Sequence, residues 1–300
     1  MSLIIFSSCC TWWFAVQVAR LLYRGRWKQL VHSRRRQEEM YLPLIKACQE
    51  RRRRRTGEDT TTATSYVDTL LDLEVPSTEG DQRRRRKLSD GEMVGLVSEY
   101  LGASTGTVLA LLEWTLANLV LRPDVQSRLR GEVEEAAGGA YLRAVVMESL
   151  RRHPPVASAP RHMSSDVVVG GTPVAAGTLV NFSLEDIGTD GTIWTSPEQF
   201  IPDRFMPGGE GAGVRLTIGN NTKTTKVKMM PFGAGRRICP GMGYATLNFE
   251  YFLANLVRAF EWHPIKGEEV DLTPEHGFFI TMRNPLRARV VPRKTTLATT

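Results

Sequence analysis

Apolar residues recur along this chain mainly at helical spacing, and the pattern predicts a mainly α-helical fold with small β-sheets. Residues 20–55 carry one apolar stripe, which Pro43 interrupts and where we expect a kink. A loop is predicted at residues 56–66, a short helix at residues 66–75, and a polar, arginine-rich linker at residues 76–87. The first part of the chain is therefore expected to consist of helices joined by polar segments.

A long helix is predicted to follow this linker. Ser89 and Glu92 have capping-box spacing, and the helical pattern then continues to Leu121 and stops before Pro123. At about 1.5 Å per residue, such a helix is roughly 50 Å long. Small and hydroxyl residues fill its middle, Gly102–Thr107, where they lower helix propensity. Two interpretations stay open for this stretch: close packing of another element, or a groove for a flat ligand.

The second half of the chain is predicted to combine helices, strands and a loop. Helices are expected at residues 124–136 and 140–152, and β-branched runs around Gly-Gly predict a hairpin within residues 156–182. Residues 206–228 are rich in Gly, Asn and Thr, which is typical of a loop. A last helix then carries a wide apolar stripe: Ala245, Phe249, Phe252, Leu253, Leu256 and Phe260.

Composition places the chain among globular proteins. It has 300 residues, of which 42% are hydrophobic and 24% charged, enough for one large domain or two ordinary ones. The four cysteines, at positions 9, 10, 48 and 239, show no CxxC spacing. This spacing excludes the usual structural zinc patterns and a disulfide framework, and it fits a reducing compartment.

The net charge of +7 comes from clustered arginines at Arg34–Arg36, Arg51–Arg55 and Arg83–Lys87. Such runs are either solvated loops and helix ends or a surface for an anionic partner: a membrane, an acidic protein or nucleic acid. No aromatic residues are interleaved with the arginines, so base stacking has no support and no nucleic-acid partner is expected.

The N-terminus raises the question of a membrane. Leu3–Ala19 is mostly apolar, and basic residues follow it from Arg20 onward. Its length is at the low edge for a membrane span, and a cleaved signal would carry its positive charge before the apolar run. An anchor or interfacial segment and a buried core segment remain as alternatives.

The stretch PFGAGRRICPG, residues 231–241, combines a lone cysteine with glycines and arginines. Arg236 and Arg237 precede Cys239, and the last predicted helix begins just after Gly241, so nearby positive charge and helix amides favour a thiolate. No histidine lies near in sequence to act as a base. An ionised cysteine without a base suits a metal ligand, and one with space above it suits haem iron.

The same stretch resembles the haem-binding signature of the cytochromes P-450, F-x-x-G-x-R-x-C-x-G. It matches at each fixed position: Phe232, Gly235, Arg237, Cys239 and Gly241.

Two further motifs occur in the family's order. ESLR at residues 148–151 resembles the E-x-x-R of the family's K helix, and PEQFIPDRF at residues 197–205 resembles the element that follows it. The wider resemblance runs from about residue 20 to residue 293. It is strongest to the plant microsomal group, family 89 in particular, through GRWKQL, RRRQEEMYLPLI, SYVDTLLDLE and YLRAVVMESLRRHPP.

The resemblance implies the C-terminal part of the cytochrome P-450 fold, with a long I-type helix, a K helix, a cysteine haem loop and an L helix. It implies a haem b whose iron is ligated by Cys239, and propionates that bind Arg237 and His162. Further cofactor-binding residues implied by the loop are Phe232, Gly233, Gly235 and Gly241. An ordinary loop histidine is the alternative for His162.

A structural network is also implied by the resemblance. Glu148 and Arg151 lie three residues apart, so they share one helix face and can pair. Arg204 is expected to share the same carboxylate. We interpret this network as a scaffold for the haem pocket.

Two departures from the family pattern bear on function. The chain is short, and the family's N-terminal anchor, first sheet and early helices have no counterpart in it. The pattern A-G-x-D-T-T of the long helix is also altered: Gly106 stands at the acid and Val108 at the second threonine, whereas Thr107 matches the first. Because the acid and the alcohol deliver protons together, we expect weakened or uncoupled oxygen activation.

The sequence therefore supports three hypotheses. The first is a haem-thiolate monooxygenase of the endoplasmic reticulum membrane, facing the cytosol. Dioxygen and a small apolar organic substrate would meet near the catalytic Thr107, and an NADPH-dependent reductase would dock near Cys239. The second is a haem-binding remnant with impaired catalysis, and the third is a basic binding module. The expected organisation is an apolar leader at residues 1–19, helices and arginine-rich linkers at 20–87, and a haem-binding core at 88–300.

Overall fold

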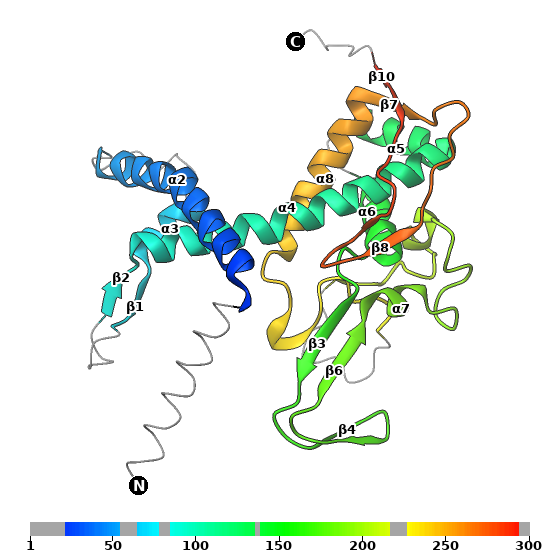
Figure 1. The fold of residues 1–300 in the computed structure, drawn as a ribbon. Helices are drawn as coiled ribbons and strands as arrows, with labels where there is room; N and C mark the ends of the chain where they lie inside the picture. Colours follow the sequence, from blue (N-terminus) through cyan, green and yellow to red (C-terminus); the bar gives the residue numbers. More distant parts are fainter. Residues whose placement is uncertain (1–21, 55–64, 78–84, 136–138, 217–226, 294–300) are drawn as a thin grey trace. The chain divides into compact units, whose positions relative to one another are not determined.

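Helix α4 (Asp90–Leu121) is the longest described element, and two compact units of the chain share it, Met1–Ala103 and Ser104–Thr300. The structure is a computed structural model, which describes residues 22–54, 65–77, 85–135, 139–216 and 227–293. It is mainly helical with small antiparallel sheets, as the apolar pattern predicts (Figure 1). The division falls inside α4, whereas the sequence analysis starts the core at residue 88. The predicted leader at residues 1–19 lies outside the described residues.

The first unit is built from two helices, a strand pair and the start of α4. Its other elements are α2 (Arg24–Arg54), α3 (Tyr66–Asp72), β1 (Glu74–Pro76) and β2 (Arg85–Lys87). Helix α2 continues through Pro43. The short helix predicted at residues 66–75 ends at Asp72, and strands β1 and β2 pair antiparallel where the sequence predicts the end of that helix and a linker. Backbone pairing needs no apolar pattern, so the sequence does not signal it.

Capping residues explain where the helices of this unit begin. The backbone amide of Ser89 donates to Glu92 Oε2 over 2.8 Å, and the amide of Glu92 donates to Ser89 Oγ over 3.3 Å, which is the predicted capping box. Arg86 binds the same carboxylate and lowers the pKa of Glu92. A small core joins the helices: Ile45, Leu70, Met93, Val94 and Val97.

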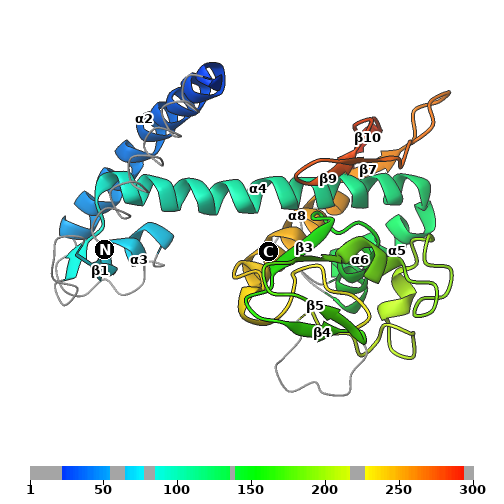
Figure 2. The ribbon, with the colours of Figure 1, turned by 60° about the horizontal axis from the view of Figure 1, so that its bottom comes forward.

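The second unit is organised around α6 (Ala140–Arg152). Almost every residue of α6 from Tyr141 to Arg151 is buried. The helix packs against the other short elements of this unit (Figures 1 and 2): α5 (Pro123–Glu135), α7 (Leu184–Thr189), α8 (Met242–Ala259) and the 3₁₀ turn η1 (Pro202–Phe205). Glu132 caps α6, since its carboxylate accepts from two of the helix's first backbone amides over 2.7 and 2.8 Å.

The C-terminal half of α4 belongs to the same core. Leu111, Leu112, Leu116 and Leu119 are buried there, and Trp114 is 1% exposed. Among the described helices, α4 alone is long and apolar enough to cross a membrane, but just over half of that apolar window is buried. A helix in the core of a soluble protein can be equally long and apolar, so packing of α4 in the core accounts for its apolar residues.

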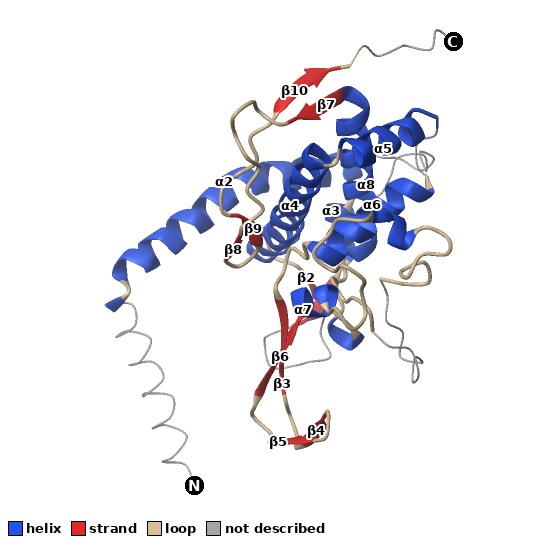
Figure 3. Cartoon of the chain, turned by 90° about the vertical axis from the view of Figure 1, so that its right-hand side faces the viewer, coloured by secondary structure: helices blue, strands red, loops and turns tan. Residues whose placement is uncertain are grey.

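The strands of the second unit form small antiparallel pairs beside the helices (Figure 3). They are β3 (Ser158–His162) with β6 (Leu179–Ser183), β4 (Val167–Val169) with β5 (Thr172–Val174), β7 (Phe260–His263) with β10 (Arg289–Pro292), and β8 (Pro274–His276) with β9 (Ile280–Met282). The hairpin predicted within residues 156–182 is confirmed. Its turn uses Gly170 and Gly171 at positive φ, a conformation that favours glycine.

His153 is a buried neutral base in this core. Its ring stacks on Trp114 with centroids 4.3 Å apart, and Asn118 Nδ2 lies 3.1 Å from its Nε2. Burial lowers the pKa of His153 well below 6.5, and the positive charges of Arg152 and Arg151 lower it further. The folded state therefore binds the proton less readily than the unfolded state does.

The chain should lose stability as the pH falls below 6.5, because His153 then takes up a proton in the unfolded state but not in the folded state. This group alone contributes a slope of up to about 1.4 kcal/mol per pH unit. His153→Gln keeps an amide near Asn118 and removes this titration. Urea unfolding at several pH values from 7.5 to 5 should give a shallower slope for the variant, and equal slopes would refute the assignment.

Candidate functional site

The cysteine loop is shaped by two glycines and one backbone hydrogen bond. Gly233 and Gly235 have φ values of 72° and 68°, in the left-handed region that side chains rarely adopt. The loop then forms the 3₁₀ turn η2 (Gly235–Arg237), and the backbone amide of Cys239 donates to the carbonyl oxygen of Phe232 over 2.9 Å. The chain thereby folds back so that the cysteine follows directly after the turn.

This loop presents the thiol of Cys239 at the surface. Cys239 is a free, exposed cysteine, and α8 begins three residues later with Gly241 as its N-cap. A Cβ added at Gly241 would lie 4.0 Å from the sulfur, whereas one added at Gly235 would meet nothing within 4 Å. A side chain at position 241 would thus contact the sulfur, and glycine avoids this contact.

The Cys239 thiol, as a single protein ligand, fits a haem. Among the described residues, no group of three or more His, Cys, Asp and Glu side chains is placed to hold a metal ion. A protein-only metal site is thus not formed in this part of the chain. A single exposed thiol on a helix-capping loop instead fits an iron whose remaining ligands come from a macrocycle.

Basic residues lie in the loop and on the neighbouring strand β3. Arg236 and Arg237 are exposed beside Cys239, and His162 is exposed at the end of β3. No described interaction joins Arg237, His162 and Cys239 to one another. Arg161 was not singled out from the sequence, yet its Nη2 lies 3.8 Å from the position of a Cβ on Gly233. Strand β3 therefore borders the cysteine loop, a contact that no local sequence pattern signals.

Glu148, Arg151 and Arg204 meet in a fully enclosed ion-pair network. Arg151 Nε donates to Glu148 Oε2 over 2.7 Å, and Arg151 Nη2 donates to Oε1 over 2.9 Å. Arg204 Nε donates to the same Oε1 over 3.1 Å, and so does the backbone amide of Ile201 over 2.8 Å. The three side chains are 0%, 0% and 3% exposed. The carboxylate is thus saturated by donors from α6 and from the segment around η1.

Backbone carbonyl groups accept further hydrogen bonds from both guanidinium groups. Arg151 Nη1 donates to the carbonyl of Gly188 over 2.7 Å, and Arg204 Nη2 donates to the carbonyl of Ser196 over 2.7 Å. A side chain at Gly188 would overlap the backbone of Arg151, so only glycine allows this approach.

Glu210 completes the network, although no sequence pattern predicts its role. It pairs with Arg204, and its carboxylate also accepts from the backbone amide of Thr195. Burial opposes ionisation of Glu210, but these hydrogen bonds and the nearby guanidinium outweigh burial and lower its pKa.

The network is connected to the segment that leads into the cysteine loop. The Arg151 guanidinium lies over the Trp194 ring at 5.4 Å, and Trp194 Nε1 donates to the carbonyl of Lys228 over 3.0 Å. Lys228 precedes Pro231, where the loop begins, by three residues. The buried network therefore contacts, through Trp194, the segment that directly precedes the loop.

The middle of α4 is closely packed at Gly106. A Cβ at this position would overlap the ring of Phe279, which lies between strands β8 and β9. The groove interpretation is thus wrong at Gly106, because an aromatic ring occupies the space. Phe279 was missed from the sequence, since 173 residues separate it from Gly106 and no local pattern links them. The hydroxyl of Thr107, one residue on, donates to the carbonyl of Ser104 over 3.4 Å.

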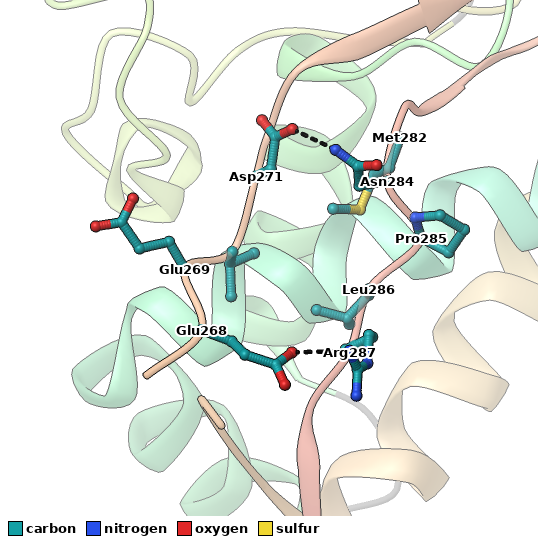
Figure 4. Close-up of a pocket in the computed structure, with 9 residues that line it drawn as sticks. Glu268, Glu269, Asp271, Met282, Asn284, Pro285, Leu286 and Arg287 are labelled. Carbon is teal, nitrogen blue, oxygen red and sulfur yellow. Dashed lines mark hydrogen bonds and ion pairs between the residues drawn. The ribbon is translucent and has the colours of Figure 1, made fainter. Parts of the chain in front are cut away.

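A surface recess of about 550 Å³ lies elsewhere in the second unit (Figure 4). Two of its carboxylates bind other lining residues: Asp271 accepts from Asn284 Nδ2 over 2.8 Å, and Glu268 pairs with Arg287 over 3.3 Å. None of its lining residues belongs to the cysteine loop or to α4. It is therefore distinct from the candidate haem site.

Comparison with known proteins agrees with the class that the fold and the loop indicate, a mainly helical protein with a cysteine loop suited to haem. The family model for cytochrome P-450 matches residues 1–290. Cytochrome P-450 89A9 of Arabidopsis thaliana is 37% identical over 92% of this chain and 55% of its own length. Cytochrome P-450 78A1 of Zea mays is 35% identical over 82% of the chain and 45% of its own length. (+)-Menthofuran synthase of Mentha piperita is 33% identical over 81% of the chain and 49% of its own length.

The chain belongs to the cytochrome P-450 family. Membership implies a haem cofactor, and the predicted fold class is confirmed. The chain spans about half the length of the curated relatives it matches.

Replacing Glu148 should strongly destabilise the second unit. Glu148→Ala leaves the buried guanidinium of Arg151 without a carboxylate and that of Arg204 with Glu210 alone, which costs about 3–5 kcal/mol. Glu134→Ala is the matched control, because Glu134 pairs with Arg130 at the surface over 2.8 Å, where an ion pair contributes less than about 1 kcal/mol. Urea unfolding followed by circular dichroism measures both variants, and similar losses would contradict the network's structural role.

Packing between Gly106 and Phe279 should appear as an energetic coupling. Gly106→Ala should destabilise the chain by about 1–3 kcal/mol, because the new methyl group overpacks against the ring. In a Phe279→Ala background the same substitution should be stabilising, since alanine favours helix by up to about 1 kcal/mol over glycine. A double-mutant cycle on unfolding free energies tests this, and additive effects would exclude the contact.

Proposed function

We propose that this chain supplies the haem-binding part of a cytochrome P-450 monooxygenase, with the thiolate of Cys239 as the iron ligand. The observation that carries this proposal is the cysteine loop, in which the Cys239 amide binds Phe232 while the thiol stays exposed. When bound, haem supplies the redox chemistry by which dioxygen and reductase-derived electrons oxidise an organic substrate. Arg237 and His162 are exposed basic residues that suit its propionates, and the half-buried Arg161 is a third basic residue near the loop.

The chain's own contribution to proton delivery is proposed to rest on Thr107. Its hydroxyl oxygen can accept a hydrogen bond from a water molecule while its proton is directed at Ser104. The neighbouring Gly106 brings no carboxylate, and the Phe279 ring packs there instead. The apolar ring packed at Gly106 suits a small apolar substrate, but proton delivery is left without an acid at this position.

The lack of a carboxylate at Gly106 favours a second candidate function, a haem protein with impaired turnover. Without the acid, a large share of the electrons from NADPH should end in peroxide and not in product. Both candidates share the haem site, so they differ in turnover and not in binding.

Proposed partners follow from the charge distribution. Arg236 and Arg237 form an exposed basic surface beside Cys239 that suits an acidic, NADPH-dependent reductase. On α2, the exposed side chains of Trp27, Leu30 and Val31 lie on one face among many basic residues, which suits an anionic membrane surface such as the cytosolic face of the endoplasmic reticulum. These features support the monooxygenase reading without identifying a substrate.

The proposal is tested by the spectrum of the reduced chain with carbon monoxide. A chain expressed with haem supply should show a strongly red-shifted Soret band, which Cys239→Ser should lose because the thiolate is gone. Cys48→Ser is the matched control, since Cys48 is the other free cysteine of the described residues and lies on α2. An unshifted band in the wild-type chain, or the same loss in both variants, would refute Cys239 as the ligand.

A second readout separates the two candidate functions. Product and hydrogen peroxide are quantified per NADPH consumed, with a plant reductase added. Product as the main outcome supports the enzyme, whereas peroxide alone with an intact Soret band supports the impaired haem protein.

A further inference from the structure

Apolar side chains are exposed on one face at the start of helix α2. Trp27, Leu30 and Val31 lie there, and Tyr23 continues the face, because the Trp27 amide donates to the Tyr23 carbonyl over 2.9 Å along the helical path. The exposed fractions are 58% for Tyr23, 43% for Trp27, 62% for Leu30 and 51% for Val31. We refer to these four residues as the Trp27 face. Large apolar side chains gathered at the surface of a helix indicate a binding surface.

The spacing of the Trp27 face matches that of a helix bound in the groove of another protein. Counted from Tyr23, its side chains stand at i, i+4, i+7 and i+8. Helices that bind an apolar groove use anchors at this spacing. The face ends at Arg34, which occupies its next position and donates to the carbonyl of Gly91 over 2.5 Å. A face of about two turns suits a short groove.

Basic residues surround the Trp27 face and are not used inside the described part of the chain. Arg24, Arg26 and Lys28 are exposed, and none of them forms an ion pair with another described residue. The sequence from residue 22 to residue 37 contains no aspartate or glutamate. These three cations are therefore available to a partner that carries negative charge.

Helix stability does not explain why the cations lie at this end of α2. The first turn of the helix contains no acidic residue, whereas Arg24 and Arg26 belong to it. Positive charge is unfavourable there, because the free amides of a helix N-terminus carry partial positive charge. Carboxylates of a partner would offset this cost. Charge complementarity thus indicates an acidic protein whose groove accepts an apolar helix face.

We propose that the Trp27 face is the docking surface for an acidic calcium sensor of the EF-hand class. Calcium opens a methionine-rich apolar groove in such a sensor. Trp27 inserts into this groove, and Arg24, Arg26 and Lys28 pair with carboxylates at its rim. Docking depends on calcium, because the groove is closed without it.

Calcium would in this way regulate the proposed membrane contact of α2. The Trp27 face cannot meet the sensor and an anionic membrane at the same time, so the two partners compete for it. This competition rests on the proposed membrane contact. Docking of the sensor does not rest on it, and neither depends on haem binding or turnover.

The docking is tested by fluorescence anisotropy of labelled calmodulin titrated with the full chain. The chain should bind in calcium and lose binding when a calcium chelator is added. Trp27→Ala should raise the dissociation constant about tenfold or more, because a buried aromatic anchor contributes much of the binding energy. Val168→Ala is the matched control, since this apolar side chain is 71% exposed but lies on β4. Circular dichroism melts should be unchanged in both variants.

A second pair of variants tests the cations. Arg26→Ala combined with Lys28→Ala should slow association with calcium-loaded calmodulin, and the effect should shrink at high salt. Arg35→Ala combined with Arg54→Ala is the matched control, because it removes the same charge from two arginines that already pair with glutamates one turn away on α2. This control should associate at close to the wild-type rate.

Vesicles of phosphatidylcholine and phosphatidylserine separate the sensor from the membrane. Calcium-loaded calmodulin should release the wild-type chain from these vesicles. Calmodulin binding without vesicle binding would support the docking and refute only the membrane contact. Vesicle binding without calmodulin binding would overturn the docking and leave the membrane contact in place. Binding that persists in the chelator, or equal weakening by Trp27→Ala and Val168→Ala, would also overturn it.

Discussion

A buried carboxylate shared by two guanidinium groups is the constraint on which the second unit depends. Glu148 lies on α6, the most buried helix, and it accepts hydrogen bonds from Arg151, Arg204 and the backbone of Ile201. Removing charges from water costs several kcal/mol for each ion, so the arrangement is favourable only when every donor and acceptor is satisfied. This requirement fixes α6 against the 3₁₀ turn η1 and explains the close backbone approach at Gly188.

The same constraint reaches the cysteine loop through aromatic and backbone contacts. Arg151 lies over Trp194, which donates to the carbonyl of Lys228, and the loop begins shortly afterwards at Pro231. From there, positive φ at Gly233 and Gly235 and the hydrogen bond from Cys239 to Phe232 determine where the sulfur lies. The ionic network thus performs no chemistry itself. It positions a short loop whose single thiol is suited to bind iron.

Sequence reasoning succeeded where the determining interactions are local. The capping box at Ser89, the ends of the helices and the pairing of Glu148 with Arg151 depend on residues a few positions apart, so their spacing is visible in the sequence. It failed where packing joins distant segments. Three contacts show this: Phe279 against Gly106, Arg161 beside Gly233, and Glu210 beside Arg204. In each pair, neither residue belongs to a local sequence pattern that predicts the contact. The pairing of β1 with β2 was missed for a related reason, because it depends on backbone hydrogen bonds and not on an apolar pattern.

The central claim is that the Cys239 loop places a sulfur on haem iron, and the coordination shell of that iron tests it most directly. Iron X-ray absorption spectroscopy on the haem-loaded chain should detect one sulfur ligand together with the porphyrin nitrogens. Cys239→Ser should remove the sulfur signal while Cys48→Ser leaves it in place. A shell of nitrogen and oxygen ligands alone in the wild-type chain would contradict the assignment.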